Sequence, residues 1–110
     1  MKLERSITTD INESTICERL ATYFAFAGYQ QSVSQPHLLA YRRGKFLSLT
    51  AEGSPVNAVI QIGGSLDQKT QVLVTLEIDT KGQFVVEFER NYWRQQLDDI
   101  EKAIQFGKGT

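Results

Sequence analysis

Four segments with strand-like patterns follow one another between residues 29 and 79, separated only by short turn signals. In the clearest of them, residues 70–79, apolar side chains occupy every second position: Val72, Val74, Leu76 and Ile78. Successive side chains of a strand point to opposite faces, so this alternation predicts a strand with one buried face. Consecutive strands joined by short turns pair antiparallel, and the run therefore predicts an antiparallel meander.

The other strand-like segments are shorter or less regular. We predict strands over residues 29–34 and 37–43, with a turn at Gln35-Pro36, because proline disfavours regular structure in the residue before it. Residues 56–64, "VNAVIQIGG", alternate and form the next strand. Residues 2–9 alternate weakly and end in two β-branched threonines, which predicts one more strand at the start of the chain.

A helix is predicted over residues 13–27. Asn12 is placed as its N-cap, because an asparagine side chain can accept a hydrogen bond from a free first-turn N–H. Gly28 ends it, since glycine adopts the left-handed conformation that closes many helices. Apolar residues recur at steps of three and four along one face of this segment: Ile16, Leu20, Tyr23, Phe24 and Ala27.

The segment "GQFVVEFERNYWRQQLDDIEKAI", residues 82–104, supports two interpretations. Its length and the spacing of its apolar residues favour a helix over residues 86–105, preceded by an extended segment at 83–85. Its β-branched and aromatic beginning instead favours a further strand over residues 83–89. In the helical interpretation one stripe faces the core: Val86, Trp93, Leu97, Ile100 and Ile104.

The predicted fold class is α+β, in one domain spanning residues 1–110. The order is β-α-β-β-β-β-α, with an antiparallel sheet of about five strands. Each helix has one apolar stripe, and the two stripes are buried if both helices pack on the same face of the sheet.

Three short sequences carry a resemblance to known families. They are "AGYQ" at the end of the first helix, "LLAYRRG" at the end of the third strand, and "IDTKGQFVVEFERNYWRQQLDDIEKAI" leading into the last helix. Together they resemble a largely uncharacterised family of small bacterial proteins with a Gly-Gln pair and an aromatic-Trp pair in the C-terminal helix. A threonine usually caps that helix, whereas the matching Val86 cannot. The order of elements resembles the helix-grip and TATA-binding-protein-like folds, in which a curved sheet wraps a long C-terminal helix.

The charge balance and the single cysteine limit the classes of function. With 12 basic and 13 acidic residues the net charge is −1, so no overall field attracts nucleic acid, and we expect none as a partner. One cysteine cannot form an internal disulfide, which is compatible with a reducing compartment. No stretch resembles a signal peptide or approaches the ~18 apolar residues of a membrane span, so we predict a cytoplasmic protein; peripheral membrane contact stays open.

Residues with catalytic or metal-binding chemistry are few. His37 is the only histidine and Cys17 the only cysteine, which is too few for a Cys/His zinc site. Asp98 and Asp99 diverge by about 100° on a helix and do not converge on one site. We therefore predict no catalytic residues, no metal, no cofactor and no enzymatic activity.

The basic cluster "YRRGKF" is the candidate partner-binding surface. Exposed apolar residues beside charges mark interaction sites, provided that residues 46–50 form a loop. The alternative is that residues 46–50 prolong the third strand and bury Leu47 and Leu49. On the last helix, Tyr92 lies at the margin of the apolar stripe, and its polar tip suits a groove or interface. The candidate residues are Arg42, Arg43, Lys45, Phe46, Leu47 and Tyr92.

These observations lead to a prediction of a non-catalytic protein-binding or adaptor domain. Its partner is another protein, or a second copy of itself paired through a sheet edge. The alternative is a carrier of a hydrophobic small molecule or lipid between the sheet and the C-terminal helix. The resemblance to helix-grip folds, which often hold such a cavity, implies this second role.

Overall fold

A computed structural model of the chain describes residues 1–44, 55–64, 69–79 and 87–107, with the backbone alone given for 87–89. The fold is α+β and has the predicted order of elements. These elements are β1 (Lys2–Thr9), α1 (Glu13–Phe26), β2 (Gln30–Gln35), β3 (Leu38–Arg43), β4 (Val56–Gly64), β5 (Thr70–Ile78) and α2 (Glu87–Phe106).

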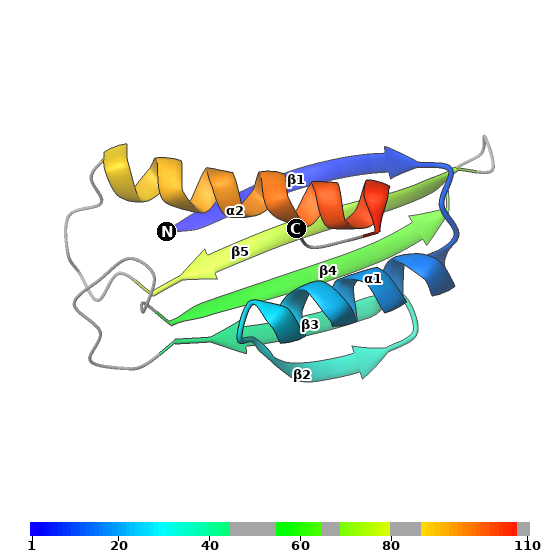
Figure 1. Cartoon of the computed structure of the whole chain (residues 1–110), viewed down its shortest axis with the longest axis horizontal. Helices are drawn as coiled ribbons and strands as arrows, with labels where there is room; N and C mark the ends of the chain where they lie inside the picture. The colour runs from blue at the N-terminus through cyan, green and yellow to red at the C-terminus, as the bar shows by residue number, and fades with distance from the viewer. Residues whose placement is uncertain (45–54, 65–68, 80–86, 108–110) are drawn as a thin grey trace.

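The five strands form one antiparallel sheet in the order β1-β5-β4-β3-β2 (Figure 1). The meander from β2 to β5 is confirmed, because each of these strands pairs with its neighbour in sequence. β1 joins the far side of β5, where Leu3 lies opposite Leu76 and Ile7 opposite Val72. The chain therefore begins next to its last strand, which leaves β1 and β2 as the two edges among the described strands.

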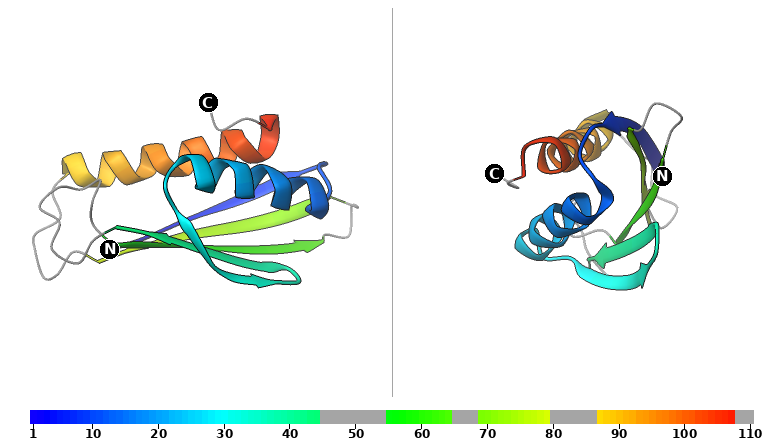
Figure 2. Two further views of the ribbon diagram at one scale, coloured as in Figure 1. Left: turned by 60° about the horizontal axis from the view of Figure 1, so that its bottom comes forward. Right: turned by 90° about the vertical axis from the view of Figure 1, so that its right-hand side faces the viewer.

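Both helices lie on the same face of the sheet, as predicted (Figure 2). α2 packs against β1 and β5, while α1 lies beside α2 and above β3 and β4 (Figure 1). The opposite face carries no described helix (Figure 2). This arrangement follows from the alternation in the strands, because only one of their two faces is consistently apolar.

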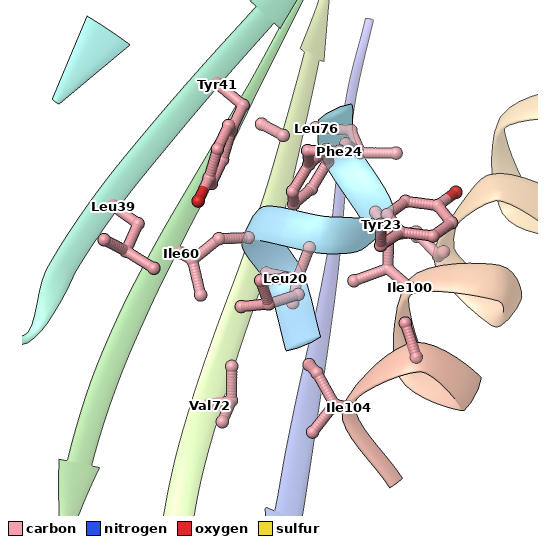
Figure 3. Close-up of a cluster of buried hydrophobic side chains, with 14 of the residues drawn as sticks. Leu20, Tyr23, Phe24, Leu39, Tyr41, Ile60, Val72, Leu76, Ile100 and Ile104 are labelled. Carbon is pink, nitrogen blue, oxygen red and sulfur yellow. The ribbon is translucent and has the colours of Figure 1, made fainter. Parts of the chain in front are cut away.

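The core fills the space between the helices and the sheet (Figure 3). In β4 and β5 every second residue is buried, from Val56 to Ile62 and from Val72 to Ile78. Each fully buried aliphatic or aromatic side chain contributes about 1.5–3 kcal/mol relative to exposure. The largest fully buried side chains come from both helices and from β4 and β5: Trp93, Phe24, Ile16, Leu20, Ile60, Leu76, Ile100, Ile104, Val72 and Val74.

The ends of α1 confirm the predicted capping. The Oδ1 atom of Asn12 accepts a hydrogen bond from the N–H of Thr15 at 2.8 Å. At the other end the N–H of Tyr29 donates to the carbonyl of Phe24 at 2.8 Å, and Gly28 has a φ of 85°. Glycine meets no steric penalty at a positive φ, and the chain can therefore reverse into β2.

The C-terminal segment is helical from Glu87 to Phe106. The alternative prediction of a strand over residues 83–89 is therefore wrong at residues 87–89, which belong to the helix. The longer periodic pattern prevails, since Trp93, Leu97, Ile100 and Ile104 need a common face in order to be buried together. The predicted start at Val86 and the extended segment 83–85 lie outside the described residues.

Trp93 should be a main support of the core. It is 1% exposed, so Trp93→Ala is expected to lower the free energy of unfolding by about 3–5 kcal/mol through lost burial and a cavity. Urea unfolding followed by circular dichroism measures this loss. The matched control is Phe106→Ala on the same helix, where the side chain is 79% exposed and the change should stay within about 0.5 kcal/mol. Equal losses in the two variants would contradict the packing described.

Candidate functional site

Residues at the ends of all five strands line a hollow of about 920 Å³ at the end of the sheet where the chain begins. We call it the strand-end hollow. Its lining comes from the starts of β1, β2 and β4 and the ends of β3 and β5, together with Gly28 beside the end of α1. The lining residues are Met1, Lys2, Gly28, Gln30, Arg42, Arg43, Gly44, Pro55, Val56, Asn57, Glu77, Ile78 and Asp79.

The lining combines charged and apolar side chains. Among the 13 lining residues that the structure describes, five are charged, three of them basic and two acidic. The main chain of Met1 and Ile78 pairs at this end, since each backbone nitrogen donates to the carbonyl of the other at 2.8–2.9 Å. Backbone hydrogen bonds between β1 and β5 therefore hold one side of the hollow. Its mixed lining suits a ligand with both polar and apolar groups.

Arg42 lies on the sheet face that the described helices leave open. It is exposed, and its cross-strand neighbours are Gln30 and Asn57. The same row continues through Glu77 to Lys2, so a polar row crosses all five strands. Arg42 makes no ion pair with any described residue, so its guanidinium is free to meet an external acceptor.

Arg43 points to the opposite, helix-covered face. Its Nη1 atom donates to the carbonyl of Ala27 at 3.0 Å, and its Cζ atom lies 4.7 Å from the centroid of the Tyr29 ring. Its Nη2 atom lies 3.4 Å from the hydroxyl of Tyr92, a weak hydrogen bond. Arg43 thereby links the end of α1, the start of β2 and the first half of α2. Its buried Nε atom has no hydrogen-bond partner among the described residues.

An aromatic cluster lies next to Arg43 and continues into the core. Phe24 stacks on Tyr41 with 4.3 Å between ring centroids, and it meets the edge of Tyr29 at 4.9 Å. In Figure 3 the two side chains leave α1 in different directions: Phe24 points toward the strands and Tyr23 toward α2. Burial raises the pKa of three tyrosine hydroxyls: Tyr23, Tyr29 and Tyr41. For Tyr23 and Tyr29 the Arg43 guanidinium opposes this shift, because a nearby positive charge favours the phenolate.

The structure brings together only some of the predicted site residues. Arg43 and Tyr92 contact each other, and both are half-buried, so they support the wall of the hollow rather than project from it. Arg42 projects from the other face. Three of the predicted site residues lie outside the described residues: Lys45, Phe46 and Leu47. The two alternatives for residues 46–50, strand or loop, also concern residues outside the described part. Gly44, which precedes them in the chain, lines the hollow.

His37 lies in the turn between β2 and β3, one residue later than the predicted turn at Gln35-Pro36, and has a φ of 67°. Its Nδ1 atom is 2.7 Å from the Oε1 atom of Glu13, and its backbone N–H donates to the same carboxylate at 3.2 Å. The contact fastens this turn to the first turn of α1. The sequence pattern missed it, because the two residues are 24 positions apart.

The other reactive side chains are also engaged in the fold. Arg5 on β1 forms ion pairs with Asp98 and with Glu101 of α2, contacts that join the two ends of the chain. Burial raises the pKa of the Cys17 thiol, which disfavours the reactive thiolate. Among the residues that the structure describes, no three His, Cys, Asp or Glu side chains gather closely enough to hold a metal ion.

Comparison with known proteins supports the fold. No family model matches the chain, and no curated protein matches it in sequence. In contrast, 28 chains of solved structures match. One is the crystal structure of Ara h 8.0201, with a TM-score of 0.71, 11% sequence identity and 94% of each chain covered. The likeness supports a helix-grip-like fold, as the order of elements predicted, and at this identity it extends to the fold alone.

The buried tyrosines should make the protein sensitive to alkaline pH. An unfolded tyrosine has a pKa of about 10, and folding raises the pKa of Tyr23, Tyr29 and Tyr41. The unfolded chain therefore loses protons first, and the free energy of unfolding should fall as pH rises from about 10 through the folded pKa values. Below about pH 9 these groups should contribute no pH dependence.

Urea unfolding between about pH 8 and pH 11 measures this effect, with Tyr23→Phe as the matched variant because it keeps the ring and removes one titrating group. The alkaline loss should be smaller in the variant than in the parent chain. Identical losses would mean that Tyr23 does not contribute.

Proposed function

We propose that this chain is a non-catalytic protein-binding domain whose partner docks at the strand-end hollow. The observation that carries the proposal is the mixed character of the lining, in which five of the 13 described residues are charged. Protein interfaces are about as apolar as the rest of a protein surface, and they are enriched in arginine. Two arginines, Arg42 and Arg43, stand on neighbouring positions of β3 at this hollow.

The two arginines take different roles in this proposal. Arg42 is exposed and without an ion pair among the described residues, so it contacts an acidic or carbonyl group of the partner. Arg43 is held by Ala27, Tyr29 and Tyr92, and it keeps the wall of the hollow rigid. Lys45, Phe46 and Leu47 remain proposed contacts, because they follow the lining residue Gly44 in the chain.

Reversal of the Arg42 charge tests the site. Arg42→Glu should remove the partner proteins that the immobilised parent domain retains from host lysate, by about tenfold or more if Arg42 is an interface hot spot. Quantitative mass spectrometry of the retained proteins measures the change. Lys102→Glu is the matched control, because it makes the same charge change at an exposed position near the C-terminal end of α2, away from the hollow (Figure 1).

The control should retain the partners at the parent level, and thermal unfolding should show that both variants fold. Unchanged partners in Arg42→Glu would reject the assigned surface. Equal losses in Arg42→Glu and Lys102→Glu would indicate a nonspecific charge effect and would also reject it.

A carrier of a hydrophobic small molecule is the second candidate. The volume of the hollow favours it, because about 920 Å³ lies within the roughly 300–1,000 Å³ of small-molecule pockets. The helix-grip-like fold is compatible with ligand binding as well. The described part of the lining argues against it, because such pockets are mostly apolar, whereas four of its 13 described residues have large apolar side chains: Met1, Pro55, Val56 and Ile78.

Native mass spectrometry of the protein purified without detergent separates the two candidates. For the protein-binding domain we expect the mass of the bare chain. A stoichiometric adduct that organic solvent extracts would instead support the carrier.

The location of the protein and the exclusion of nucleic acid as a partner are proposed from its composition. In the described part of the chain, no helix is both long and apolar enough to cross a membrane. We propose a cytoplasmic location on the basis of the single cysteine, and no nucleic-acid partner on the basis of the net charge of −1.

A further inference from the structure

Residues 20–41 contain no Asp, Glu, Lys or Arg. The whole chain has 25 such residues in 110, so a stretch of 22 residues would carry about five. The charge-free run forms the second half of α1, all of β2 and most of β3. Much of it lies at the surface, where charged side chains are normally interspersed.

β2 is the edge strand of the sheet on this side, with β3 as its only neighbour among the described strands. Its sequence is QQSVSQ, and all of its residues except Val33 are exposed. Edge strands usually carry charges, especially lysine, or a proline, to prevent pairing with another chain. β2 has neither, and its only protections are its length of six residues and a register shift between Gln31 and Val33.

The outer face of α1 adjoins this edge. Its exposed residues in the charge-free run are Ala21, Thr22, Ala25 and Phe26, and the side chain of Phe26 is 80% exposed. Only residues 27–29 separate the end of α1 from the start of β2. Figure 1 and Figure 2 show α1 on the side of the sheet where β2 lies, with α2 on its other flank. We call this helix face and the neighbouring strand edge together the α1–β2 surface.

We propose that the α1–β2 surface is the contact between two copies of this chain. In the dimer β2 pairs antiparallel with β2 of the second copy, and the charge-free end of each α1, residues 20–26, borders the joint. A two-fold axis brings a surface against itself, so a charged residue near the axis meets its own like charge. A charge-free surface avoids that repulsion, and glutamine amides can both donate to and accept from their symmetry mates.

The size of the surface sets the expected strength of the contact. β2 spans about 20 Å at ~3.4 Å per residue, and the charge-free part of α1, residues 20–26, spans about 11 Å at 1.5 Å per residue. A strip of this length and two elements wide is small beside the ~800 Å² per partner of a standard interface. The dimer should therefore be weak, with dissociation in the micromolar range or above. This proposal does not rest on the partner proposed for the strand-end hollow, although Gln30 belongs to both surfaces.

Sedimentation equilibrium over about 1 μM to 1 mM of the purified full chain tests the proposal. The parent chain should dimerise as its concentration rises. Phe26→Glu should weaken the dimer by about tenfold or more, because it introduces a charge and removes the largest exposed apolar side chain of the surface. The matched control is Phe106→Glu, which makes the same change at a side chain 79% exposed on α2 and should leave the dimer intact.

Ser34→Lys provides a second variant, because it places on β2 the kind of charge that protects natural edges. It should also shift the chain toward monomer, while circular dichroism shows that all three variants fold. A parent chain that stays monomeric up to about 1 mM would overturn the proposal. So would a dimer that persists in both Phe26→Glu and Ser34→Lys, or one that Phe106→Glu weakens equally.

Discussion

The pairing of β4 with β5 is the interaction on which the rest of the structure depends. Nine consecutive residue pairs, from Val56 opposite Ile78 to Gly64 opposite Thr70, hold the two longest strands in one register. A shift of one residue would turn every apolar side chain to the open face. In the observed register the buried side chains of both strands lie on the same face of the sheet. They form the apolar surface on which α1 and α2 pack.

Arg42 and Arg43 show how that register also shapes the candidate site. The alternation continues from β4 into β3, so neighbouring arginines must point to opposite faces. Arg43 lies beneath the helices, where it contacts the carbonyl of Ala27 and the ring of Tyr29. Arg42 is exposed at the surface. A basic pair that reads in sequence as one patch is therefore divided into a structural residue and a candidate contact residue.

Much of the fold could be predicted because its signals are local. The cap at Asn12, the glycine after α1 and the alternation in β5 each lie within a few residues of the feature that they produce. The ion pair of Arg5 with Asp98 could not be predicted, because 93 positions separate the two residues. The strand-end hollow was also missed, because it is assembled from five strand ends that are distant in sequence.

The sequence by itself determined the types and order of the elements, the apolar face of each, and the place of Trp93 in the core. These follow from periodicity, which is a property of neighbouring residues. Only the tertiary structure decided that β1 pairs with β5, that β2 is left as a charge-free edge, and that Arg43 is held beneath α1. Those outcomes depend on which distant segments come together. The alternation of apolar and polar residues along the chain carries no information about such long-range pairing.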